Sequence, residues 1–171
     1  MKKKLNNKKM EDDFLIDAHD LQLSELISKN LVIAGLDIGD KIVGISVTDR
    51  RIKIASAIGT LEKKFQKSDF EYIVNLLKPY NVGFIVFGWP LHMDGSVSEQ
   101  CKRNLNFARE LHKYINVPFV KWDERFSTKV IDRIMIEAAL SRSKRKKVID
   151  KVASAYILQG ILDFLNKNQQ F

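Results

Sequence analysis

Three apolar segments follow one another early in the chain, and the connections between them are too short to contain a helix. They are LVIAGLD (31–37), KIVGISVTD (41–49) and RIKIASAIGTL (51–61). Apolar segments this close together fold back on one another, so they predict three antiparallel strands. This feature constrains the fold more than any other, because it commits the chain to a sheet before its first long helix.

After these segments the pattern alternates between helices and strands. The predicted elements are, in order, a helix over 68–80, a strand over 82–88, a helix over 96–115, a strand over 117–122, and helices over 127–140 and 149–166. Strands separated by helices are usually parallel, so we expect them to extend the first three strands. The sequence therefore predicts an α/β fold with a mixed five-stranded sheet flanked by helices.

The first thirty residues differ from the rest of the chain. The stretch MKKKLNNKKM is polar and predicts disorder, whereas DFLIDAHDLQLSELI (13–27) predicts a short amphipathic helix. We therefore divide the chain into a partly disordered N-terminal appendage (1–30), one domain (31–167) and a tail (168–171). The sequence assigns no function to the appendage.

The composition fits one folded domain in a reducing compartment. Hydrophobic residues make up 45% of the 171 residues, which argues against disorder. The single cysteine, Cys101, cannot form an intrachain disulfide and is expected to be a small buried residue on a helix. No apolar run is long enough to span a bilayer and the first residues lack the apolar stretch of a secretory signal, so we expect a cytoplasmic protein without a membrane partner.

The net charge of +8 is unevenly distributed. Residues 1–30 carry as many acidic residues as lysines, so the excess positive charge lies in residues 31–171. A basic domain suggests a nucleic acid as partner, although a solvated lysine-rich surface is the alternative. The densest part is SRSKRKKVIDK, which carries Arg142, Lys144, Arg145, Lys146, Lys147 and Lys151.

Four carboxylates are predicted to lie at one edge of the sheet. Asp37 ends the first strand, Asp123 and Glu124 follow the fifth, and Asp150 is expected to open the last helix. Functional groups in open α/β sheets gather beyond the carboxyl ends of parallel strands. Carboxylates without converging histidines or cysteines suit a hard cation, Mg²⁺ or Mn²⁺, rather than zinc.

Each of these carboxylates also has a structural interpretation. Asp37 could be a turn residue whose oxygens accept hydrogen bonds from N–H groups around Gly39. Glu124 could pair with Arg125, and Asp150 could be a negative charge favoured at a helix start. Their joint placement is what favours a metal site.

Three other residues near this edge could contact nucleic acid. Trp89 and His92, in the loop after the fourth strand, could stack on a base or sugar, with core packing as the alternative for Trp89. Arg125 could contact the phosphate that is cleaved, with a structural salt bridge as its alternative.

Four segments carry a resemblance to a known family. They are GLDIGDKIVGISVTD, IVFGWPLHMDGS, FVKWDERFST and SRSKRKKVIDKVASAYILQ. In this order and spacing they resemble the signature segments of the YqgF/RuvX family, from about residue 31 to 165. The resemblance implies a ribonuclease H-like fold. It also implies a metal-dependent endonuclease that hydrolyses phosphodiester bonds and processes the 5′ end of the small-subunit ribosomal RNA precursor.

The resemblance also implies roles for the carboxylates. Asp37, Glu124 and Asp150 occupy the acidic active-site positions of the family and would be both catalytic residues and ligands of Mg²⁺ or Mn²⁺, with Asp123 as a further candidate ligand. The chain departs from the pattern at Asp40 and Ile42. The family usually has Thr or Ser at the first position and Arg at the second, so an arginine that could bind phosphate is missing and a negative charge is added.

Other functions remain open at this point. A Holliday junction resolvase acting on branched DNA is one alternative, and it should form a homodimer because symmetric cleavage needs two active sites. A non-catalytic module that binds structured RNA or branched DNA is another, and it could be a monomer. An actin-like or sugar-kinase ATPase, suggested by DIGDK, is weaker because such enzymes usually have two duplicated halves.

Overall fold

The computed structural model describes residues 13–123 and 142–168, and within the last helix it describes the side chains of residues 152–167. In this part of the chain the strands form a six-stranded sheet in the order β1-β6-β5-β2-β3-β4. The strands are β1 (Leu15–Ile16), β2 (Val32–Ile38), β3 (Ile42–Thr48), β4 (Ala55–Glu62), β5 (Val82–Trp89) and β6 (Phe119–Asp123). Strands β2, β3 and β4 are antiparallel neighbours, whereas β1, β6, β5 and β2 are parallel.

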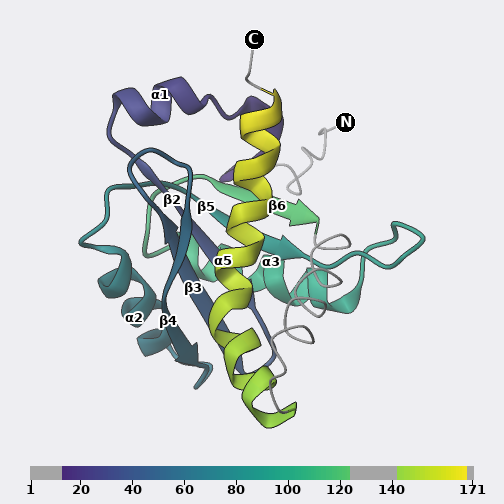
Figure 1. Ribbon diagram of the computed structural model, residues 1–171. Helices are drawn as coiled ribbons and strands as arrows, with labels where there is room; N and C mark the ends of the chain where they lie inside the picture. The colour runs from purple at the N-terminus through teal and green to yellow at the C-terminus, as the bar shows by residue number, and fades with distance from the viewer. Residues whose placement is uncertain (1–12, 124–141, 169–171) are drawn as a thin grey trace, which may run out of the picture.

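Helices cover both faces of this sheet. They are the 3₁₀ helix η1 (Ala18–Asp20) and the α-helices α1 (Leu23–Ser28), α2 (Lys67–Leu77), α3 (Glu99–His112) and α5 (Arg142–Asn168). Figure 1 shows α5 running along one face, with α3 behind the sheet and α2 beside β4. None of the described helices combines the length and the apolar character needed to cross a membrane.

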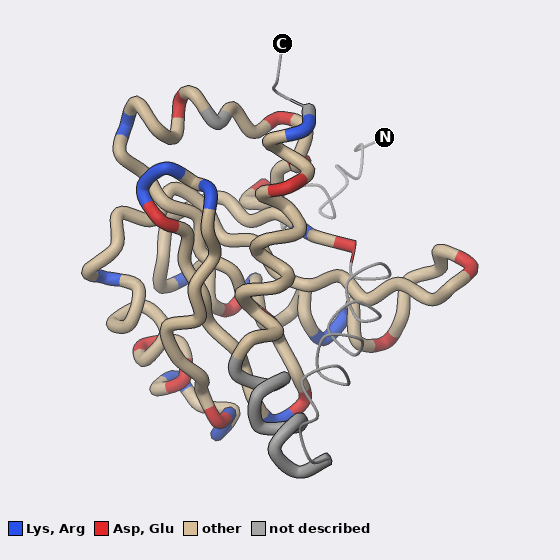
Figure 2. The backbone as a smooth tube through the Cα atoms, viewed as in Figure 1, with Lys and Arg blue, Asp and Glu red and all other residues tan. Residues whose placement is uncertain are grey.

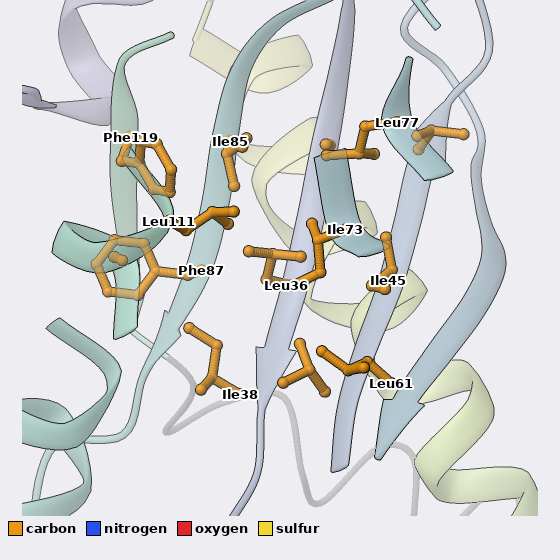
Figure 3. Close-up of a cluster of buried hydrophobic side chains, with 14 of the residues drawn as sticks. Leu36, Ile38, Ile45, Leu61, Ile73, Leu77, Ile85, Phe87, Leu111 and Phe119 are labelled. Carbon is orange, nitrogen blue, oxygen red and sulfur yellow. The ribbon is translucent and has the colours of Figure 1, made fainter. Parts of the chain in front are cut away.

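The face that carries α2 and α3 buries one hydrophobic cluster. Ile73 and Leu77 from α2 and Leu111 from α3 pack with sheet residues such as Leu36 and Phe87 (Figure 3). These helix residues recur at three- and four-residue spacing, which places them on one side of each helix. The alternation along β2 assigns Ala34, Leu36 and Ile38 to this face.

The opposite face is covered by α5. Ile157, Leu158 and Ile161 pack with Ile33 of β2 and Val86 of β5. β5 is buried on both faces, as its unbroken apolar sequence predicts. The two faces of β2 therefore differ: one lies under α2 and α3, and the other lies under α5.

The expected α/β class with a mixed sheet is confirmed, but the prediction of five strands is wrong. The sixth strand, β1, comes from the N-terminal appendage and pairs in parallel with β6, with Leu15 opposite Phe119. Phe14 is buried, with its ring stacked on His112 at 4.8 Å between centroids. The backbone N–H of Phe119 donates to the carbonyl oxygen of Phe14 at 2.7 Å, so β1 supplies hydrogen-bond partners to the edge of β6.

The helix predicted over 13–27 is accordingly wrong in its first half, because only its last residues form α1. The third strand begins at Ala55 rather than at residue 51. The carboxylate of Asp49 accepts the backbone N–H groups of Lys53 at 2.7 Å and Ile54 at 3.0 Å, which fixes a turn before β4. Likewise α2 begins at Lys67, capped by Gln66 instead of the predicted serine.

The last helix is longer than predicted. It begins at Arg142 rather than at residue 149, so Asp150 lies inside α5 and does not open it. The basic run SRSKRKK is therefore largely helical instead of a loop. Lysine and arginine are good helix formers that carry no hydrophobic period, which is why the pattern missed this extension. The helix predicted over 127–140 lies outside the described residues.

Candidate functional site at the carboxyl edge of the sheet

Asp37 lies near the carboxyl end of β2 with a glycine on each neighbouring strand. In β3 its pairing partner is Gly44. In β5 the register that pairs Leu36 with Phe87 makes Gly88 the next residue alongside it. Asp37 is partly exposed, and neither flanking position carries a side chain that could crowd its carboxylate. This edge of the sheet therefore leaves room for a ligand beside Asp37.

The side chain of Asp37 belongs to the face that α5 covers. Residues alternate along β2, and Ile33 and Gly35 lie on this face. A Cβ atom at Gly35 would lie 2.9 Å from Cβ of Leu158 and 3.1 Å from the carbonyl oxygen of Ser154. The helix therefore approaches β2 as closely as a glycine permits, just before Asp37 in the strand.

A small residue of α5, Ser154, lies at this close approach. Ser154 is 0% exposed, and its Oγ has no hydrogen-bond partner among the described side chains and backbone. Figure 1 shows that α5 runs antiparallel to β2, so its N-terminal half lies over the carboxyl end of the strand. Asp150 is one helical turn before Ser154, so its backbone lies further toward the end of β2 that carries Asp37. Its side chain lies outside the described part.

Two amides on α3 hold the ends of β2 and β5 together. Gln100 Nε2 donates to the carbonyl oxygen of Ile38 at 2.9 Å and to Asn104 Oδ1 at 2.8 Å. Asn104 is 1% exposed, and its Nδ2 donates to the carbonyl oxygen of Gly88 at 2.8 Å. Sequence reasoning missed this pair. The signal for it was a polar residue at position 104 within the apolar stripe of α3.

The turn after Asp37 is tight. The backbone N–H of Gly39 donates to the carbonyl oxygen of Ile42 at 3.0 Å. A Cβ atom at Gly39 would lie 2.8 Å from the same oxygen, so this turn requires glycine. The N–H of Gly39 is therefore used within the turn itself, in its bond to Ile42.

Asp123 lies on a different face from Asp37. It ends β6, where it pairs with Trp89, and it is partly buried. Its neighbour Trp122 packs against Phe164 of α5, so alternation directs Asp123 to the other side of the strand. Asp123 also lines a cavity of about 440 Å³ whose opposite wall is formed by the N-terminal segment, including Asp17 and His19.

Trp89 packs against the cluster under α3 and carries the ammonium of Lys121 over its ring at 4.6 Å. Its proposed contact with nucleic acid is untested, as is that of His92, which lies in the loop after β5. Glu124 and Arg125 lie outside the described residues. The side chains of the basic run also lie outside them, although their backbone belongs to α5: Arg142, Lys144, Arg145, Lys146, Lys147 and Lys151.

The described residues contain no group of three or more His, Cys, Asp and Glu side chains placed to hold a metal ion. This result excludes a complete metal site built from described side chains alone. On the α5 face at this edge the described carboxylates are Asp37 on β2 and Glu62 at the end of β4, two strands away.

The electrostatics of this edge involve a nearby lysine. Burial lowers the pKa of the Lys63 ammonium below its usual range. The negative charges of Asp40 and Asp37 oppose that shift, because each raises the pKa of Lys63. Figure 2 shows charged positions of both signs at the turn between β2 and β3.

A family model and individual relatives both match this chain in sequence. A family model described as RuvX, Holliday junction resolvase, matches residues 31–164. A protein of Clostridium botulinum (strain Hall) with the curated name "Putative pre-16S rRNA nuclease" is 44% identical over 135 residues, covering 79% of this chain and 98% of its own. A protein of Thermoanaerobacter pseudethanolicus with the same name is 40% identical over 132 residues, covering 77% of this chain and 95% of its own.

Among solved structures, the Thermus thermophilus RuvC in complex with a Holliday junction substrate is similar to this chain. It is 10% identical with a TM-score of 0.49, and the match covers 82% of this chain and 97% of that one. The family model begins at residue 31, so β1, η1 and α1 lie outside the region it matches.

Proposed function

The chain belongs to the RuvX family, and on this premise we propose that it is a metal-dependent endonuclease that hydrolyses phosphodiester bonds in nucleic acid. Its proposed task is to process the 5′ end of the small-subunit ribosomal RNA precursor. The curated name of its relatives at 40–44% identity gives that precursor as the substrate, and the 5′ end is part of our proposal. A protein with this substrate would work in the cytoplasm.

The observation that carries the proposal is the position of Asp37. Its carboxylate lies near the carboxyl end of β2, between Gly44 and Gly88, on the face that α5 covers closely. A phosphodiester is bulky and anionic, so it needs open space beside a catalytic carboxylate. The two glycines provide that space.

We propose that Asp37, Glu124 and Asp150 hold one or two divalent ions, Mg²⁺ or Mn²⁺. The donor set fits such ions because it consists of carboxylate oxygens, which hard cations prefer. The direction of α5 supports Asp150, since its backbone lies one turn beyond Ser154 toward Asp37. When bound, the metal supplies an activated water and neutralises a phosphate oxygen.

Two acids, Asp123 and Glu124, follow Trp122, and the alternation of side chains along β6 helps to decide which of them is the metal ligand. Asp123 lies on the face opposite to that of Asp37, whereas Trp122 lies on the same face. The parity of β6 therefore disfavours Asp123 as the partner of Asp37. We propose Glu124 as the ligand and assign Asp123 no direct role with the metal.

The remaining residues of the site are proposed to orient Asp37 and to bind the nucleic acid. Gln100 and Asn104 fix the ends of β2 and β5, which sets the position of Asp37 relative to its neighbours. Arg125 is proposed to contact the phosphate that is cleaved. The basic residues in the N-terminal half of α5 are proposed to attract the polyanion toward carboxylates that would otherwise repel it.

A second candidate function is the resolution of Holliday junctions, which the description of the matching family model favours. The two functions differ in substrate and in oligomeric state. A resolvase that cuts symmetrically should form a dimer, whereas a nuclease acting on an RNA end can act as a monomer.

The test offers the purified full chain two substrates. A ribosomal RNA precursor fragment and a four-way DNA junction are each incubated with Mg²⁺, Mn²⁺ or a chelator, and the products are mapped. Cleavage of the RNA that depends on the metal is expected. Cleavage of the junction alone would favour the resolvase, and binding that is equal in chelator with no cleavage of either substrate would contradict the enzyme proposal.

A further inference from the structure

A second cavity opens at the same edge of the sheet as Asp37, on the side of α3. Its volume is about 550 Å³, and it is lined by Asp40, Lys63, Phe65, Arg103, Asn106, Phe107 and Glu110. The backbone N–H of Lys63 donates to the carbonyl oxygen of Lys41 at 2.8 Å, which joins the end of β4 to the turn that follows Asp37. The cavity therefore lies beside the turn that follows Asp37, on the face of the sheet opposite to the Asp37 side chain.

Phe65 stands out among the lining residues because its ring is 80% exposed. Its backbone has φ of 57°, in the left-handed region that bulky L residues rarely adopt. The exposed ring of Phe65 gains little stability from burial, and its backbone is strained. Strain of this kind persists where the surrounding structure imposes it, and it clusters at functional sites.

The loop that carries Phe65 is held in place by a buried carboxylate. Asp69 is 3% exposed, and its Oδ2 accepts the backbone N–H groups of Lys64 at 2.9 Å and Phe65 at 2.8 Å. The same carboxylate completes the capping box at the start of α2 with Gln66. These hydrogen bonds therefore hold the backbone of Phe65 in place at the mouth of the cavity.

The charges around Phe65 suit an anionic ligand with a flat ring. The Lys63 ammonium lies 5.9 Å from the ring centroid of Phe65 and 5.1 Å from that of Phe107, so one cation faces both rings. The acidic lining residues already have partners. Asp40 pairs with Arg103 at 3.5 Å, and Glu110 pairs with Lys113 at 2.6 Å.

Exposed lysines add positive charge around this cavity. Lys41 lies in the turn after β2 and Lys64 precedes Phe65 in sequence, whereas Lys67 pairs with Glu71 at 2.9 Å. Proteins bind single-stranded nucleic acid by stacking bases on aromatic side chains while lysine or arginine contacts the backbone. The cavity carries both elements within a few residues of the turn that follows Asp37.

We propose that this cavity binds an unpaired nucleotide of the substrate strand, with the base stacked on Phe65 and the adjoining phosphate near Lys63. This inference rests on the proposed nuclease function and narrows its substrate. The strand that enters the site should carry an unpaired segment beside the bond that is cleaved, rather than a continuous duplex.

The test measures binding of a fluorescent single-stranded RNA by the full chain in chelator, so that no cleavage occurs. Replacing Phe65 by Ala keeps the strained backbone and removes only an exposed ring, so the protein should stay folded, as circular dichroism can check. Affinity should fall on the order of tenfold or more. Phe65→Trp should retain the affinity, because it keeps a ring on which a base can stack.

A matched control comes from another exposed apolar residue. Ile54 is 62% exposed next to the start of β4, at the opposite end of that strand, so Ile54→Ala should leave the affinity unchanged. Binding of a blunt duplex should change little in Phe65→Ala, since a fully paired strand offers no base to stack.

The outcomes separate the two proposals. If the unaltered chain binds single strands and Phe65→Ala binds them equally well, the stacking inference is wrong while the nuclease proposal stands. If Phe65→Ala weakens single-stranded and duplex binding alike, the site is a general anion surface and the inference is wrong. If the unaltered chain binds no nucleic acid of either form, both proposals fail.

Discussion

Replacing Gly35 by alanine should separate α5 from the sheet at the place where the candidate site depends on their contact. The added Cβ would lie 2.6 Å from Oγ of Ser46, 2.9 Å from Cβ of Leu158 and 3.1 Å from the carbonyl oxygen of Ser154. Two of these atoms belong to α5 and one to β3. The Oγ of Ser46 can rotate away, but the Cβ of Leu158 and the carbonyl oxygen of Ser154 cannot move without moving α5.

The expected cost follows from these contacts. Overpacking a well-packed core by a methyl group costs about 1–3 kcal/mol. For a chain of this size, each kcal/mol lowers the melting temperature by about 2–4 °C, so a decrease of roughly 2–12 °C is expected. If Asp150 acts with Asp37, moving α5 also displaces one ligand from the other. A displacement of about 1 Å can cost on the order of 100-fold in rate.

The assay compares Gly35→Ala with a substitution of similar size away from the site. A Cβ atom at Gly83, near the amino end of β5, would lie 3.0 Å from Cβ and Cδ1 of Leu31 and 3.3 Å from Leu26. Thermal unfolding by circular dichroism gives the stability of both variants, and cleavage is measured where both are folded. Gly35→Ala should lose activity beyond its loss of stability, whereas Gly83→Ala should not. Equal activities at equal folded fraction would refute the reasoning.

Three further predictions concern other parts of the molecule. Asn104→Leu leaves the carbonyl oxygen of Gly88 without its donor at 2.8 Å, so the free energy of unfolding in urea should fall by about 1–3 kcal/mol. The control Asn106→Ala, on the exposed side of α3, should change this free energy by less than about 0.5 kcal/mol. Burial raises the pKa of Asp49, but the N–H groups of Ile54, Lys53 and Arg51 outweigh it and hold this pKa below its usual value of 3.8. The stability contributed by Asp49 is therefore complete above that value and is lost as the pH falls through the lowered pKa. Asp49→Asn should remove this part of the acid dependence, as unfolding across a pH series can check, and leave cleavage unchanged. Replacing Lys144, Arg145, Lys146 and Lys147 together by glutamine should reduce the slope of log affinity against log salt by about 0.7 for each phosphate of a single strand that is no longer neutralised, and an unchanged slope in a salt titration would show that this run does not bind nucleic acid.

The sheet was largely predictable from the sequence because its strands follow apolar patterns that nothing else explains. β2, β3 and β5 lie within a residue or so of the predicted bounds. β1 was not predictable, because two residues are too few to show a period and its hydrogen bonds depend on the edge of a distant strand, β6. Its segment also carries the apolar spacing that suggested a helix.

The candidate site was predictable only where a motif marks it. The position of Asp37 near the end of β2 follows from the sequence. The amides of Gln100 and Asn104 were missed because buried polar residues on an apolar stripe form no motif. The exposed ring of Phe65 was missed because sequence patterns do not assign a left-handed backbone to phenylalanine.

The catalytic role of Asp37 is the central claim, and the substitution Asp37→Asn tests it most directly. This change keeps the shape of the side chain and removes the charge that would hold a divalent ion. Mn²⁺ binding, measured by calorimetry, and cleavage should be lost together, by orders of magnitude in rate. Nucleic acid affinity in chelator should persist or rise, since a carboxylate that repels phosphate is gone. If Asp37→Asn instead binds Mn²⁺ and cleaves like the unaltered chain, or if it fails to fold, Asp37 is a structural residue and the account is wrong.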